Sequence, residues 1–91
     1  MTAVRLVQLA RILGLDPSTI DDDVARAAIA ARPADLGAAL FEEAAQNDDV
    51  TSTETALDYL EGRLAFFSDL VGGEAEAAVR AEFGERLKAW E

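Results

Sequence analysis

The feature that most constrains this chain is its longest helical pattern, which covers residues 51–73. Apolar side chains recur there at alternating steps of three and four residues, and this spacing places them on one face of an α-helix. Thr51 and Glu54 have the spacing of a capping box, and Gly72 and Gly73 suit the left-handed turn that closes a helix. The sequence therefore predicts one helix over the whole stretch, with a buried stripe made of Leu57, Leu60, Leu64, Phe67 and Val71.

The same stretch carries more apolar surface than one stripe requires. Tyr59 and Phe66 fall on a second line that also contains Ala56, Arg63 and Leu70. Phe66 and its neighbour Phe67 should point about 100° apart on a helix, so they cannot share one narrow face. The second line is either covered by another layer of the domain or exposed to a partner. Trp90 presents the same two alternatives, because large aromatic side chains serve as core residues and as interface anchors. We predict that Tyr59, Phe66 and Trp90 contact a partner.

The rest of the chain also favours helices. Alanine, which has the highest helix propensity, is abundant, whereas β-branched and aromatic residues are scarce. We predict an all-α fold, a small bundle of four or five short helices that forms a single domain over residues 1–91 and packs around the first and fourth helices. The first helix should be capped by Thr2 and closed by Gly14. The second helix should start between residues 16 and 21 and end at Arg32, and the third should run from Pro33 to about residue 46. The fourth and fifth helices are expected over residues 51–73 and 74–90.

Charge is the strongest compositional bias. The chain has eighteen acidic and eight basic residues, which gives a net charge of −10. Only the segment of residues 1–15 has a positive net charge, which comes from Arg5 and Arg11. An acidic surface repels phosphate, which disfavours binding to nucleic acid and to anionic lipid. No apolar run approaches the ~20 residues that span a bilayer, and polar residues interrupt the apolar N-terminus before a signal-peptide core can form. We expect the protein in the cytoplasm or within a macromolecular assembly, without contact to a membrane.

The sequence contains few groups that could perform chemistry. Cysteine and histidine are absent, so the sequence offers no thiolate, imidazole or usual zinc chemistry. Asp21, Asp22 and Asp23 point in different directions on a helix, and the segment from Asp48 lacks the glycine and the glutamate of a calcium loop. There is no glycine-rich phosphate loop, and no histidine to activate a serine. We expect no enzymatic activity, no catalytic residues, no cofactor, no metal and no small-molecule substrate.

Residues 8–20 resemble a helix-turn-helix, with Ala10 in the first helix, Gly14 in the turn and Ile20 in the second helix. The resemblance implies a recognition helix that begins near Ser18 and enters the major groove of DNA. Three consecutive aspartates follow directly after Ile20, where phosphates would require basic or hydroxyl side chains.

A second resemblance covers the same region. Leu13-Gly14-Leu15-Asp16-Pro17, followed by the DDDVARAAIAA of residues 21–31, is similar to the opening of the small helical head-to-tail connector proteins of tailed phages. The resemblance implies a ring-forming adaptor without catalytic residues, and the acidic residues fit this role. From Phe41 onward the similarity does not continue.

Two functional hypotheses follow. The first is a non-enzymatic, acidic helical protein–protein interaction or adaptor module, acting as a homo-oligomer or in a larger, phage-connector-like assembly. Arg5 and Arg11 would dock an acidic partner beside the three aromatic contact residues. The alternative is a helix-turn-helix-like DNA-binding or regulatory domain formed by residues 8–32.

Overall fold

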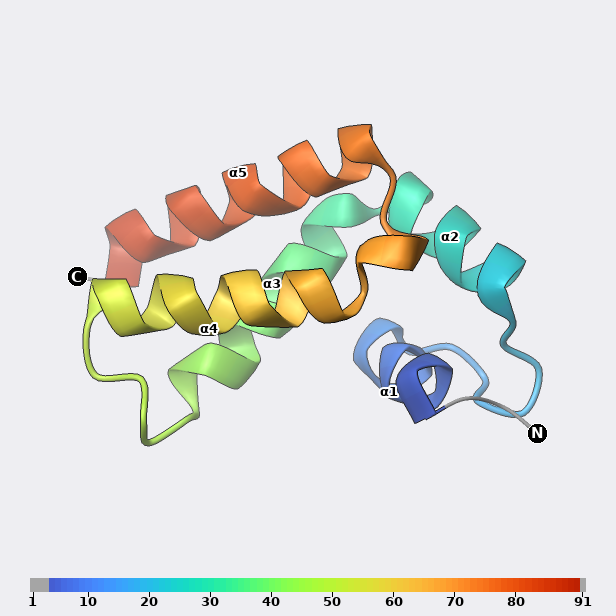
Figure 1. The fold of residues 1–91 in the computed structure, drawn as a ribbon, viewed down its shortest axis with the longest axis horizontal. Helices are drawn as coiled ribbons and strands as arrows, with labels where there is room; N and C mark the ends of the chain where they lie inside the picture. The colour runs from blue at the N-terminus through green and yellow to red at the C-terminus, as the bar shows by residue number, and fades with distance from the viewer. Residues whose placement is uncertain (1–3, 91) are drawn as a thin grey trace.

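The computed structural model describes residues 4–90, and their regular structure is entirely helical (Figure 1). The prediction of a small all-α bundle is confirmed for these residues. Thr2, the expected cap of the first helix, lies outside them. In chain order the elements are α1 (Val4–Leu13), α2 (Asp22–Ala31), α3 (Pro33–Ala45), α4 (Thr53–Phe66), the 3-10 turn η1 (Ser68–Leu70) and α5 (Gly73–Trp90).

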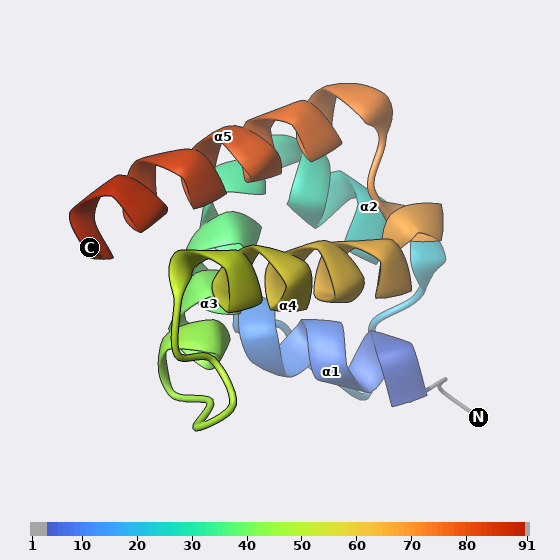
Figure 2. The same cartoon turned by 60° about the vertical axis from the view of Figure 1, so that its left-hand side comes forward.

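The central helix of the bundle is α3. It contacts each of the other four α-helices, and Figure 2 shows it behind α4, with α5 above and α1 below. Its buried residues cover more than one stripe, because Gly37 and Phe41 are buried in addition to Leu36, Leu40 and Ala44. The prediction that the bundle packs around its first and fourth helices is therefore wrong, since the residues of α3 are the ones buried on several sides.

The most extensive helix pair is formed by α3 and α5. Gly37 permits this packing, because a Cβ atom at that position would lie 2.9 Å from Cβ of Glu82 and 3.2 Å from the carbonyl oxygen of Val79. Val79 and Phe83 of α5 are fully buried against the core. On its other side α5 is tied to α4 by Arg80, which binds Glu61 at 2.7 Å and also binds Glu76. The hydrogen bond to Glu61, and then that to Glu76, raises the pKa of Arg80 above its ordinary value.

The helix predicted over residues 51–73 is shorter than expected at both ends. Its N-cap is Ser52, whose hydroxyl accepts from the backbone N–H of Thr55 at 3.2 Å. Thr55 Oγ1 in turn accepts from the backbone N–H of Ser52 at 2.9 Å. The capping box therefore exists, but it lies one residue later than the Thr51–Glu54 pair that the sequence indicated.

At its other end α4 stops at Phe66, and η1 follows. The break lets the chain turn toward α2, which η1 contacts, and it buries Phe67, Leu70 and Val71 together. Leu57, predicted to belong to the buried stripe, is instead 45% exposed.

The connection between α1 and α2 follows local hydrogen bonding. Gly14 has a φ of 72°, and the N–H of Leu15 donates to the carbonyl of Ala10 at 2.8 Å, which is the pattern of a Schellman helix end. The predicted closure at Gly14 is confirmed. Asp16 then accepts from the backbone N–H of Ser18 at 2.9 Å and from its hydroxyl at 2.7 Å. Of the starts that the sequence left open, Asp21 is the N-cap, and it accepts from the N–H of Val24.

The close approach at Gly37 leads to a stability prediction. We expect Gly37→Ala to lower the free energy of unfolding by about 1–3 kcal/mol, because the new methyl group meets atoms at or near the backbone of α5. Gly62 is the matched control, since it lies in α4 and a Cβ there meets nothing within 4 Å. Gly62→Ala should raise stability by about 0.5–1 kcal/mol through helix propensity. Urea unfolding of both variants measures the difference, and equal shifts would contradict the proposed role of Gly37.

The turn at Asp16 leads to a prediction on titration. The hydroxyl of Ser18, followed by its backbone N–H, lowers the pKa of Asp16 below its ordinary value. Such a carboxylate contributes stability near neutral pH that is lost as the pH falls through the lowered pKa. We expect Ser18→Ala to raise the pKa of Asp16 part of the way toward its ordinary value, as followed by NMR titration. An unchanged titration curve would show that the hydroxyl does not stabilise the carboxylate.

Candidate interaction surface

A pocket lies between α1 and α4, two helices that can be followed in Figure 2. In these two described helices no Cα atom of one approaches within 8 Å of the other, although both contact α3. Long side chains from all three helices fill the gap, and they leave a pocket of about 390 Å³. Its lining consists of Gln8, Arg11, Ile12, Glu43, Tyr59 and Arg63.

Arg63 connects the three helices at this pocket. Its Nη2 donates to Oε1 of Gln8 at 3.4 Å and lies 3.6 Å from Oε1 of Glu43. The network is incompletely satisfied, because Nε of Arg63 and Oε2 of Glu43 are buried without a hydrogen-bond partner. Buried polar atoms are paired in most proteins, so two unpaired atoms in the wall of one pocket mark it as unusual.

Two phenylalanine rings lie beside the guanidinium of Arg63. Its central carbon is 5.4 Å from the ring centroid of Phe66 and 5.2 Å from that of Phe67. The rings are stacked, with centroids 5.1 Å apart and planes 20° apart. The two side chains do not point about 100° apart as predicted for a continuous helix, because α4 ends at Phe66. Phe67 is fully buried, whereas Phe66 remains 40% exposed. No second layer therefore covers Phe66 in the described domain, whereas Ala56 and Leu70 of the same predicted line are buried.

The structure brings three of the five predicted contact residues into one region. Arg11 and Tyr59 line the pocket together, and Phe66 extends the surface through its contact with Arg63. We call this region the α1–α4 surface, defined by Gln8, Arg11, Ile12, Tyr59, Arg63 and Phe66.

The other two predicted residues lie elsewhere. Arg5 forms an ion pair with Asp69 at 3.1 Å, so its charge is engaged within the domain. Arg26 donates to the backbone carbonyl of Asp69 at 3.3 Å, and the two arginines together fasten η1 to α1 and α2. Trp90 is the last residue of α5, and its ring meets Phe41 edge-on with centroids 6.4 Å apart.

Sequence reasoning missed Gln8, Glu43 and Arg63 as site residues. The line from Tyr59 to Phe66 already contained Arg63, so the spacing could have identified this arginine. No comparable signal exists for Gln8 and Glu43, because only the tertiary fold brings α1 and α3 to this side chain.

Arg11 has an exceptional electrostatic environment. Among residues 4–90, every other lysine and arginine has an acidic partner within 4.0 Å. Arg11 has none and is exposed. The pocket thus carries two guanidinium groups and one carboxylate, in a chain whose net charge is −10.

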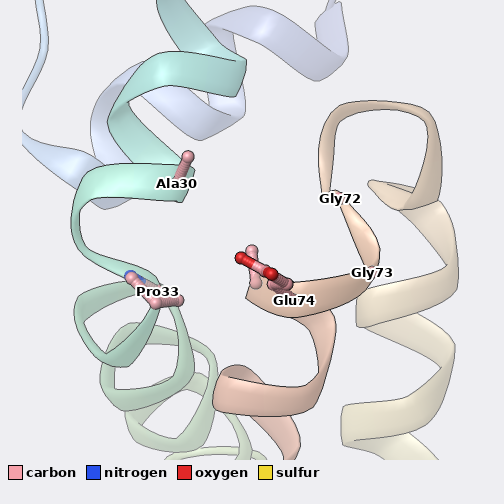
Figure 3. Close-up of a pocket in the computed structure, with 6 residues that line it drawn as sticks. Ala30, Pro33, Gly72, Gly73 and Glu74 are labelled. Atoms are coloured by element: carbon pink, nitrogen blue, oxygen red, sulfur yellow. The ribbon is translucent and has the colours of Figure 1, made fainter.

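A larger pocket of about 470 Å³ lies where α5 begins, facing the junction of α2 and α3. Figure 3 shows Glu74 directed across it toward Ala30 and Pro33. Glu74 is the one charged side chain of its lining, which otherwise consists of alanine, glycine and proline. The lining of this pocket therefore offers a single carboxylate and no second titratable side chain to act with it. Within residues 4–90 there is also no cluster of three or more carboxylates that could hold a metal ion.

The helix-turn-helix geometry implied by residues 8–32 differs from what the structure contains. Residues 14–21 separate α1 from α2, whereas the motif joins its helices by a turn of about 3–4 residues. Ser18 lies in this connection, and the second helix starts at Asp22, with Asp21, Asp22 and Asp23 all exposed at its N-terminus.

In comparisons with known proteins, no family model, curated protein or solved structure matches the chain. Over the described residues, no helix combines the length and apolar character needed to cross a membrane.

The position of Arg63 leads to a stability prediction. We expect Arg63→Ala to lower the free energy of unfolding by about 1–2 kcal/mol, because it removes two ring contacts and leaves Glu43 without its cation. Arg32→Ala is the matched control, since Arg32 is exposed and its ion pair with Asp35 is 3.9 Å long. An exposed pair of this kind should contribute less than about 0.5 kcal/mol. Urea unfolding compares the two, and equal effects would mean that Arg63 acts only as a surface charge.

Proposed function

We propose that this chain is a non-enzymatic protein-interaction or adaptor module that binds a protein partner through the α1–α4 surface. The partner is either a component of a larger assembly or a second copy of the chain. Residence in the cytoplasm or within such an assembly belongs to the same proposal.

The observation that carries this proposal is the exposed ring of Phe66. The ring is held against Phe67 and the guanidinium of Arg63, so its position is already restricted before any partner binds. An aromatic side chain fixed in this way loses little conformational freedom on association, and aromatic and arginine side chains dominate the energetics of protein interfaces. The half-buried Tyr59 and the two arginines of the pocket extend the same kind of surface.

The chemistry of the pocket supports recognition over catalysis. Its guanidinium, amide and phenol groups donate hydrogen bonds, and Ile12 supplies an apolar contact. Glu43, the carboxylate of the pocket, lies beside Arg63 and has no second carboxylate or nucleophile near it within the lining. The DNA-binding alternative gains no support from the long connection before α2 or from the exposed aspartates at its start.

Phe66→Ser tests the proposal. We expect this substitution to reduce the recovery of the partner from cells that express the chain by at least about tenfold, the effect of losing a hot-spot side chain. Leu57→Ser is the matched control, because Leu57 lies on the same helix, is 45% exposed and is absent from the α1–α4 surface. The control should change recovery by less than about twofold, as expected away from the hot spots of an interface.

Absolute mass from light scattering completes this test. Self-association through the surface predicts a mass above 9.7 kDa that returns to the monomer value in Phe66→Ser. If the wild-type chain is a monomer and Phe66→Ser recovers the same proteins in the same amounts, the proposed function is wrong.

A further inference from the structure

The unpaired charge of Arg11 indicates what kind of partner the α1–α4 surface accepts. The chain has eighteen acidic residues, yet none of those described lies within 4.0 Å of this guanidinium. Arg11 is instead placed beside Gln8 and Ile12 at the rim of the pocket. Because Arg11 is not paired with any described carboxylate, its planar set of donors is available for an incoming anion.

The carboxylate of Glu43 refines the chemistry of the partner. Nε of Arg63 and Oε2 of Glu43 are buried, so an occupant meets the exposed guanidinium of Arg11 and not these two atoms. The backbone of a nucleic acid would bring further phosphates next to Glu43, which repels them. A peptide can place a single carboxylate at Arg11 and keep uncharged groups beside Glu43.

The apolar groups at the pocket add a third requirement. Ile12 lies in its lining, and the exposed ring of Phe66 is next to Arg63. A carboxylate alone would leave these groups uncovered. A segment that carries an apolar side chain beside its acidic residues would cover them and remove apolar area from water.

We propose that the α1–α4 surface binds an acidic peptide segment of another protein, with a carboxylate for Arg11 and a neighbouring apolar side chain, and that Arg11 selects it. This inference rests on the proposed interaction function and names the class of partner. Repulsion by the remaining negative charge of the domain is screened beyond a Debye length of about 8–10 Å, whereas direct contacts with Arg11 are screened much less. A short segment brings its charge to the pocket alone, whereas a long polyanion would also meet the acidic start of α2.

Binding of designed peptides to the full chain tests the inference. The probe is an acetylated and amidated peptide with two aspartates followed by leucine in a glycine and serine background. Its comparison peptide has asparagine in place of both aspartates. We expect the acidic peptide to give saturable NMR shifts at Arg11, Ile12 and Tyr59, and the asparagine peptide to bind about tenfold more weakly, as expected on loss of a charge-assisted hydrogen bond.

Two charge-matched variants separate a local effect from a change in net charge. Arg11→Gln should weaken the acidic peptide about tenfold, because it removes the selecting guanidinium. Arg32→Gln changes the net charge equally, but Arg32 is not in the lining of the pocket and is already paired with Asp35. It should therefore change the affinity by less than about twofold. Because Arg11 is exposed and unpaired, thermal unfolding of Arg11→Gln should match that of the wild type.

Several outcomes would overturn the inference. Equal binding of the two peptides, equal effects of the two variants, or no saturable shift at the pocket would each remove the acidic segment as the occupant. Tighter binding of a single-stranded oligonucleotide at the same residues would favour phosphate, and concentration-dependent shifts without peptide that vanish in Arg11→Gln would favour a second copy. If any of these occurs while Phe66→Ser still abolishes partner recovery, the interaction function stands and only the partner class is wrong.

Discussion

The packing of α3 against α5 at Gly37 is the constraint on which the rest of the bundle depends. Without a Cβ atom at this position, the two helices approach closely enough for Val79 and Phe83 to be fully buried. One side of α3 is occupied in this way, and α1 and α4 both pack against other parts of it. They therefore contact α3 without contacting one another along the backbone. The α1–α4 surface is a consequence of this arrangement, since only long side chains bridge the space between the two helices.

The sequence predicts the elements of this fold better than their arrangement. Local chemistry determines the ends at Gly14, Pro33 and Asp21, and these are visible in the residues themselves. The end of α4 at Phe66 is different, because helical spacing continues through Phe67 and Val71. The position of this helix end depends on the contact between η1 and α2, which joins segments far apart in the chain. The central position of α3 was missed for the same reason. The sequence shows more extensive apolar patterns in the first helix and in residues 51–73, and only the tertiary contacts show that α3 lies between them.

The candidate surface was predictable where a single helix carries it. Tyr59, Arg63 and Phe66 form one line on α4, so their proximity follows from helical spacing. The meeting of this line with Arg11 depends on how α1 lies against α3, which periodicity does not report. Arg5 and Arg11 look equivalent in the sequence, since both interrupt the same apolar helix. They differ in the fold because Asp69 lies opposite Arg5, whereas no acid among residues 4–90 lies within 4.0 Å of Arg11.

The ion pairs of the domain bear on how a surface of this kind would discriminate among partners. Exposed pairs contribute little to stability, and most of those in this bundle are exposed. Their consequence for binding is larger, because each engaged base is unavailable to an external anion, and the excess acids repel such anions elsewhere on the surface. An acidic segment that approaches the bundle thus meets one free guanidinium among the described residues. Because complementary charge contributes more to specificity and association rate than to affinity, tight binding at this surface would depend on the apolar contacts with Ile12 and Phe66, while Arg11 would determine which segment is accepted.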